Sequence, residues 1–96
     1  MKTLLILYAG ADNRLVERLL DAQGAGGWTE LMHAHGAGET GRHEGTRAWP
    51  GDTTVFLSVV PSDRVEALTA AIVGARAGLA AGERLHAAVL PTDAFI

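Results

Sequence analysis

Thr53–Val60 reads TTVFLSVV and has the clearest strand character of any segment in the chain. Its residues are mostly β-branched or aromatic, the types that are enriched in strands. Pro50-Gly51 precedes the run and Pro61 follows it, so turn residues bound it on both sides. This pattern predicts a strand at the centre of the fold.

Alternation divides this strand into two faces. The face expected to pack beneath the helices consists of Val55, Leu57 and Val59. The other face consists of Thr54, Phe56, Ser58 and Val60, a set unlike a solvated surface. Because an apolar sheet face exposed on a monomer promotes aggregation, we expect other subunits to cover it. The sequence therefore predicts an oligomer.

A helix is predicted both before and after this strand. The later helix begins near Ser62 or Asp63, either of which can cap its first turn. Its apolar residues recur at spacings of three and four, at Val65, Leu68, Ile72, Ala75 and Leu79. The earlier helix is capped by Asp12 or Asn13 and ends at Gly24. Its apolar face consists of Leu15, Val16, Leu19 and Leu20.

Further strands are expected at residues 3–8, 28–35 and 85–90, the last ended by Pro91. The start of the chain also resembles a signal peptide, but its apolar run is shorter than the usual hydrophobic region, so a strand is expected. The order is therefore β-α-β-β-α-β, the ferredoxin-like arrangement. This is an α+β fold in which a four-stranded antiparallel sheet carries both helices on one face. Residues 1–96 then form a single domain.

The composition excludes several classes of function. The chain has 8 Lys and Arg residues against 11 Asp and Glu residues, a formal net charge of −3. Its basic residues are scattered, so it lacks the basic stripe that binds nucleic acid. It contains no cysteine, which excludes a disulfide framework and a thiol nucleophile and fits a cytoplasmic protein. Ser58 and Ser62 have no evident base to activate them, so we do not expect an enzyme.

A polar, glycine-rich segment, HAHGAGETGRHEGTRAWPGD, occupies residues 33–52 between two predicted strands. A loop of this length in a compact domain is usually functional or disordered, because ordering it costs conformational entropy. Its glycines, Gly36 and Gly38 among them, can present backbone N–H groups to an anion, with Arg42 nearby. We interpret the segment as a ligand-sensing loop.

Three segments together resemble the PII-like superfamily, which includes the nitrogen-regulatory PII signalling proteins. Residues 24–31, GAGGWTEL, resemble the G-x-x-G-hydrophobic-T segment that leads PII proteins into their second strand. Residues 36–43, GAGETGRH, are similar to the start of the PII T-loop, and residues 59–65, VVPSDRV, to the third strand and second helix. Residues 75–84 lack the T-G-[KR]-x-G-D motif of the phosphate-binding B-loop. The resemblance is thus to a divergent, CutA-like branch, with residues 36–51 equivalent to the T-loop.

This resemblance implies a homotrimer that regulates other proteins. Its small effector, an adenine nucleotide or a small anion such as bicarbonate, would bind at clefts between subunits. The 36–51 segment would report occupancy to a membrane transporter or another target protein. The residues implied for effector binding are Thr29, Gly36, Gly38, Glu39, Arg42 and Arg84. The PII threonine that matches Thr29 lies near the nucleotide cleft.

His33 and His35 support a second interpretation, a metal-binding protein similar to the CutA metal-tolerance proteins. Residues two apart on a strand point to the same face about 6.6 Å apart, a spacing at which two imidazoles can share an ion. His43 would be a third ligand, with Glu39 or Glu44 beside it. Such donors suit a zinc or copper ion. The alternative is that His33 and His35 bind no metal and are polar residues at the fraying end of a strand.

A third interpretation is a small ferredoxin-like oligomeric enzyme that uses the open face of its sheet as a pocket. It would require turnover or a bound organic cofactor, neither of which the sequence suggests.

Overall fold

The computed structural model of the chain describes residues 1–38, 41–43 and 53–96, with the backbone alone at 37, 38 and 41–43. The main strands are β1 (Lys2–Ala9), β2 (Thr29–Ala34), β5 (Thr53–Val60) and β6 (Arg84–Pro91). The helices are α1 (Arg14–Ala22) and α2 (Val65–Ala75), and short 3₁₀ turns span Ser62–Arg64 and Arg76–Gly78. Within the segment expected to be a loop lie two short paired strands, β3 (Gly36–Gly38) and β4 (Gly41–His43).

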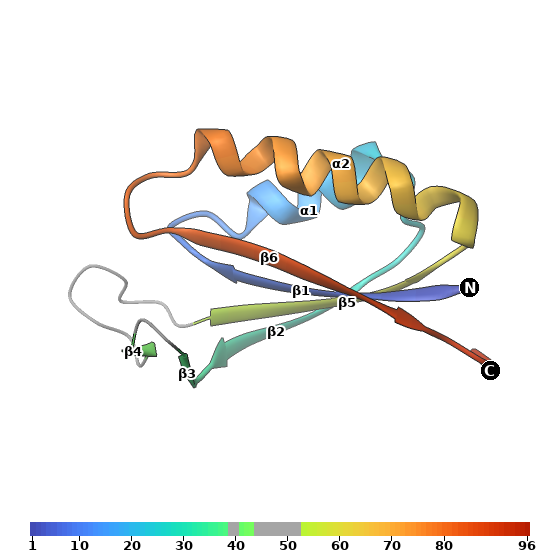
Figure 1. Cartoon of the computed structure of the whole chain (residues 1–96), viewed down its shortest axis with the longest axis horizontal. Helices are drawn as coiled ribbons and strands as arrows, with labels where there is room; N and C mark the ends of the chain where they lie inside the picture. The colour runs from blue at the N-terminus through green and yellow to red at the C-terminus, as the bar shows by residue number, and fades with distance from the viewer. Residues whose placement is uncertain (39–40, 44–52) are drawn as a thin grey trace.

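The main strands form one antiparallel sheet in the order β2-β5-β1-β6. Both helices cover the same face of the sheet, and neither covers the opposite face, here called the open face (Figure 1). This is the ferredoxin-like α+β fold that the order of elements predicts. The predicted limits of the main strands are confirmed to within one residue at each end. In the part of the chain that the structure describes, no helix is long and apolar enough to span a bilayer.

The hydrophobic core fills the layer between the helices and the sheet. Its helical side chains are Val16 and Leu20 on α1 and Leu68 and Ile72 on α2, all members of the predicted apolar faces. The largest buried strand residues are Leu4, Ile6, Tyr8, Phe56 and Leu85. Full burial of one such aliphatic side chain contributes about 1.5–3 kcal/mol. The helical periodicity of the sequence therefore identified the correct faces of both helices.

The predicted orientation of β5 is wrong. Its buried face, beneath the helices, consists of Thr54, Phe56, Ser58 and Val60, whereas Val55, Leu57 and Val59 are half-buried on the open face. The buried hydroxyls are compatible with the core because each has a partner. Ser58 Oγ donates to the carbonyl oxygen of Gly27 at 2.6 Å, and Thr54 Oγ1 donates to Asn13 Oδ1 at 3.0 Å. A buried hydroxyl that is hydrogen-bonded does not carry the usual desolvation penalty.

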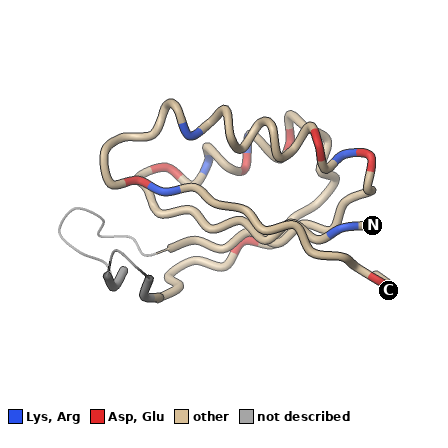
Figure 2. Tube along the Cα trace, viewed as in Figure 1, with Lys and Arg blue, Asp and Glu red and all other residues tan. Residues whose placement is uncertain are grey.

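The open face is largely apolar, although His86 of β6 also lies on it, opposite Leu7. The strand register lines up Leu90 with Thr3 and Val59, and Leu7 with Val55 and Leu31. Leu31 is 50% exposed and Leu90 is 43% exposed. Charged residues lie mainly on the helices and connections, while the four main strands carry few (Figure 2). The expectation of an open face that is not a solvated surface is confirmed, although β5 contributes different residues to it.

Of the two helices, only α1 has a cap that the sequence predicts, and Asp12 provides it. The side chain of Asn13, at the start of α1, makes no capping bond and instead accepts the hydrogen bond from Thr54. Asp12 Oδ1 accepts from the backbone N–H of Arg14 at 3.0 Å. Ser62 and Asp63 lie in a 3₁₀ turn, and α2 begins at Val65 without a side-chain cap. Asp12 therefore caps α1 through a local hydrogen bond, whereas the Asn13 side chain is used by a tertiary partner and α2 lacks its predicted cap.

Candidate functional site

A cavity of about 510 Å³ opens on the open face of the sheet, near the first residues of β1. It is lined by Thr3, Gly27, Trp28, Thr29, Leu57, Val59 and Phe95. Pockets for small ligands typically measure about 300–1,000 Å³. This cavity is therefore large enough to hold a small organic molecule.

Strand register builds the floor of the cavity. Thr3 of β1 lies opposite Val59 of β5, and Leu57 of β5 lies opposite Thr29 of β2. Because paired residues on neighbouring strands point to the same side of a sheet, all these side chains reach the open face together. Two aliphatic side chains thus form the floor, and a threonine hydroxyl lies on each side of it.

The turn between α1 and β2 supplies one wall of the cavity. Gly24 and Gly26 adopt φ values of 66° and 90°, a conformation that glycine reaches without strain. Ala25 is buried between them, and its N–H donates to the carbonyl oxygen of Leu20 at 3.0 Å. The bond from Ser58 to Gly27 then fixes the turn to β5. This turn positions Gly27 and Trp28, from the G-x-x-G-hydrophobic-T segment, against the cavity.

The chain beyond β6 supplies the other wall. The hydroxyl oxygens of Thr92 and Thr3 are hydrogen-bonded at 2.5 Å, which holds this segment against β1. Phe95 lines the cavity and is 69% exposed. None of the described residues that line the cavity is charged, so its chemistry is apolar with a few hydroxyl and backbone hydrogen-bonding groups.

Of the residues predicted to bind an effector, Thr29 lies at this cavity. It is exposed and begins β2. Gly36 and Gly38 lie in β3, where they pair with His43 and Gly41 of β4. The side chain of Arg42 and the whole of Glu39 lie outside the described residues. Their part in binding stays a prediction.

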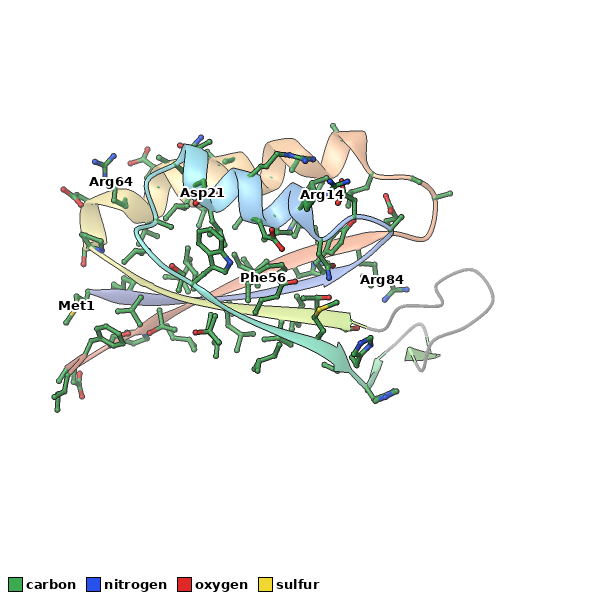
Figure 3. All side chains as sticks on the ribbon, turned by 180° about the vertical axis from the view of Figure 1, so that it is seen from behind. Met1, Arg14, Asp21, Phe56, Arg64 and Arg84 are labelled. Carbon is green, nitrogen blue, oxygen red and sulfur yellow. The ribbon has the colours of Figure 1, made fainter. Side chains whose placement is uncertain are left out.

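Arg84 lies at the other end of the sheet. It begins β6 opposite Ala9, whereas Thr29 shares a row of the sheet with Leu57, Leu5 and Ala88. Ala88 is four residues further along β6 than Arg84, a distance of roughly 13 Å at about 3.3 Å per residue. Figure 3 shows Arg84 far from Met1, whereas the cavity lies near the start of β1. A single chain therefore does not bring Arg84 to the cavity that Thr29 lines.

The strand geometry expected for the histidine pair is interrupted. His33 has a φ of 62°, and the register between β2 and β5 shifts between Leu31 and Ala34. β2 ends at Ala34, so His35 lies beyond it. Regular alternation from His33 to His35 is therefore absent. Among the residues whose side chains are described, no cluster of three His, Asp or Glu could hold a metal. The side chain of His43 lies outside that set, so the metal site stays a prediction.

An acidic pair on the helix side of the sheet was not anticipated. Glu30 of β2 and Glu17 of α1 are both half-buried. Partial burial, followed by the hydrogen bond and charge of the Glu17 carboxyl, raises the pKa of Glu30, while a hydrogen bond from Asn13 opposes that shift. Strand alternation separates Glu30 from Leu31 but does not say which of them faces the helices, so the sequence carries no clear signal for the inward position of Glu30.

Sequence reasoning missed most of the residues that line the cavity. Thr3 and Phe95 lie at opposite ends of the chain and belong to no motif. Leu57 and Val59 were predicted on the other face of β5. Strand alternation in the sequence places Leu57 and Val59 on one face of β5, but it does not say whether that face is buried or open.

Comparison with protein-family models and with curated proteins finds no match to this chain. Among solved structures, the chain is similar to CPII, a nitrogen-regulatory PII-like protein from Thiomonas intermedia K12. The CPII structure bound to ADP, AMP and bicarbonate has a TM-score of 0.69 and 23% identity, with 93% of this chain and 86% of CPII covered.

Two further CPII structures give similar values. The form bound to ADP, AMP and acetate has a TM-score of 0.64 and 21% identity, with 95% of this chain and 88% of CPII covered. The apo form has a TM-score of 0.64 and 20% identity, with coverage of 93% and 87%. At this level of identity the likeness establishes the fold. The fold implied by the resemblance to the PII-like superfamily is therefore confirmed.

Proposed function

We propose that this chain is a cytoplasmic, divergent PII-like regulatory protein that binds a small effector at the cavity beside Thr29, rather than an enzyme. The observation that carries the proposal is the position of Thr29. It belongs to the sequence segment that most resembles PII proteins, and it lines a cavity of ligand size on the same fold as CPII. CPII has been solved with ADP, AMP and bicarbonate, which makes an adenine nucleotide or a small anion the first class of effector to test.

The proposed assembly is a homotrimer. It is supported by the largely apolar open face, which includes exposed Leu31 and Leu90. An oligomer would also allow Arg84 of one subunit to approach the cavity of the next, which a single chain does not achieve. A guanidinium in that position would neutralise an anionic effector, because arginine forms bidentate hydrogen bonds with phosphate and carboxylate groups.

The proposed output is a change in the 36–51 segment. β2 begins at the cavity with Thr29 and ends at Ala34, which only His35 separates from this segment. An effector that binds more tightly to one arrangement of β2 shifts the population of the segment that follows it. A difference in affinity worth about 1–3 kcal/mol suffices to couple effector to target. The target would be a membrane transporter or another protein.

Calorimetric titration with ADP, AMP and bicarbonate tests the proposal. Thr29→Val removes one hydroxyl at nearly constant shape and is expected to weaken binding about 2- to 12-fold, the loss of one net hydrogen bond. Thr69→Val is the matched control, because the Thr69 hydroxyl donates within α2 to the carbonyl oxygens of Val65 and Glu66. Failure of all three probes to bind the wild-type protein would refute the proposed function.

A further inference from the structure

The segment after β6 crosses the open face instead of continuing along the edge of the sheet. β6 pairs with β1 as far as Pro91, opposite Lys2, and Thr92 is hydrogen-bonded to the hydroxyl of Thr3. Phe95 then lines the same cavity as Leu57 and Val59 of β5. Since β1 lies between β6 and β5, the chain reaches that cavity only by crossing β1. Figure 1 shows the C-terminal end on the side of the sheet away from the helices.

Phe95 brings an aromatic ring to the cavity and leaves most of that ring accessible to solvent. It lines the cavity yet is 69% exposed. Ile96, the next residue, is fully exposed and is not among the lining residues. An aromatic ring held at a cavity is available to stack on a planar ligand.

The rest of the lining suits a flat, uncharged ring. Trp28 supplies a second, half-buried aromatic group, and Leu57 and Val59 form an aliphatic floor. The hydroxyls of Thr3 and Thr29 can donate to or accept from ring nitrogens and exocyclic groups. Because none of the described lining residues is charged, this cavity does not neutralise a phosphate or a carboxylate. Its chemistry fits the base of a nucleotide better than its phosphates or a bicarbonate ion.

We propose that Phe95 is a specificity-determining residue that selects effectors carrying a nucleobase-type ring, which it holds against the floor of the cavity. The C-terminal segment, fixed by the Thr3–Thr92 hydrogen bond, is the wall that positions it. This inference rests on the proposed function, in which a small effector occupies the cavity. It goes further by excluding ring-free effectors from this part of the site.

The test is titration with ADP in a Trp49→Phe background. The chain has two tryptophans, so Trp28 at the cavity becomes the sole tryptophan and its fluorescence reports binding there. Phe95→Ala is expected to weaken ADP binding about 5- to 150-fold, the range for loss of one base–aromatic stack. Phe95→Tyr retains the ring and is expected to bind within about threefold of wild type, as a stacking role requires. Ile96→Ala is the matched control and leaves ADP affinity unchanged.

Thr92→Val tests whether the Thr3–Thr92 hydrogen bond positions the C-terminal segment that carries Phe95. It removes the hydroxyl that bonds to Thr3 and is expected to weaken ADP binding in the same direction as Phe95→Ala, but less. Thermal melting of each variant checks that the fold is intact. Because Phe95 is exposed and lies outside the hydrophobic core, its variants are expected to melt close to the wild-type temperature.

Several outcomes would overturn the inference, and they are distinguishable from failure of the proposed function. ADP affinity of Phe95→Ala within twofold of wild type removes the role of Phe95 and leaves effector binding intact. An equal loss in Ile96→Ala or in Phe95→Tyr shows that the ring is not what matters. Binding of bicarbonate without ADP by the wild-type protein refutes the ligand class alone. Binding of neither probe refutes both proposals.

Discussion

Ser58 Oγ donates a 2.6 Å hydrogen bond to the carbonyl oxygen of Gly27, which joins the buried face of β5 to the turn that begins the cavity. Ser58 is 2% exposed, so this hydroxyl has left water and gained one backbone partner. The same bond orients Gly27 and Trp28 at the cavity wall. A single buried serine therefore connects the stability of the core with the shape of the candidate site.

Replacing this serine tests that connection. Ser58→Ala leaves the carbonyl of Gly27 without its partner and is expected to lower the free energy of unfolding by about 1–3 kcal/mol. Ser62→Ala is the control, since Ser62 is exposed and a surface substitution usually changes stability by less than about 0.5 kcal/mol. Urea denaturation measures both. Equal midpoints for the two variants would show that the buried bond contributes nothing to the fold.

The open face predicts self-association. Leu57→Asp introduces a charge among the apolar side chains of β5 and is expected to convert an oligomer to monomer, because a charge is costly to bury without a partner. Val73→Asp is the control, since Val73 is 59% exposed on α2, on the other side of the sheet. Light scattering coupled to gel filtration gives the mass of each. A wild-type protein that is monomeric at micromolar concentration contradicts the proposed trimer.

Gly10 has no room for a side chain. A Cβ built there would meet the hydroxyl end of Tyr8, which is 1% exposed, and the Glu83 carboxylate. Gly10→Ala is therefore expected to destabilise the protein by about 1–3 kcal/mol through overpacking.

Gly74→Ala is the control for that substitution. Gly74 lies within α2, and nothing lies within 4 Å of the Cβ it would gain. Alanine is favoured over glycine in a helix by about 0.5–1 kcal/mol, so this variant is expected to be more stable than wild type. If both alanines stabilise the protein in thermal melting, Tyr8 moves freely and the crowding argument for Gly10 is wrong.

Glu30 predicts a dependence of stability on pH. Its raised pKa means that the folded state holds a proton more tightly than the unfolded chain. Its contribution to stability is therefore fully present below the unfolded pKa and is lost as pH rises through the folded pKa. Glu30→Gln stays neutral and is expected to be more stable than wild type at pH 7, with the difference disappearing near pH 4. Urea midpoints across this pH range check the prediction, and a constant difference at all pH values would contradict the raised pKa of Glu30.

Much of the fold was predictable from the sequence because it depends on local patterns. The β-branched run at Thr53–Val60 and the spacing of Leu68 and Ile72 identify a strand and a helix face without reference to distant residues. The candidate site was much less predictable. Thr29 was identified through its motif, whereas the alternation expected from His33 to His35 is broken by a positive φ and a register shift. Such a shift depends on how β2 meets β5, which no local pattern records.

The sequence by itself determined the order of strands and helices, the ferredoxin-like class and the apolar nature of the open face. Only the tertiary structure decided which face of β5 is buried. Strand alternation allows either face of β5 to be buried. The buried face is the one whose hydroxyls find distant partners, Gly27 for Ser58 and Asn13 for Thr54. The cavity has the same origin. Thr3, Thr29, Leu57 and Phe95 are far apart in the chain, and they meet because strand pairing and the crossing C-terminal segment bring them to one place.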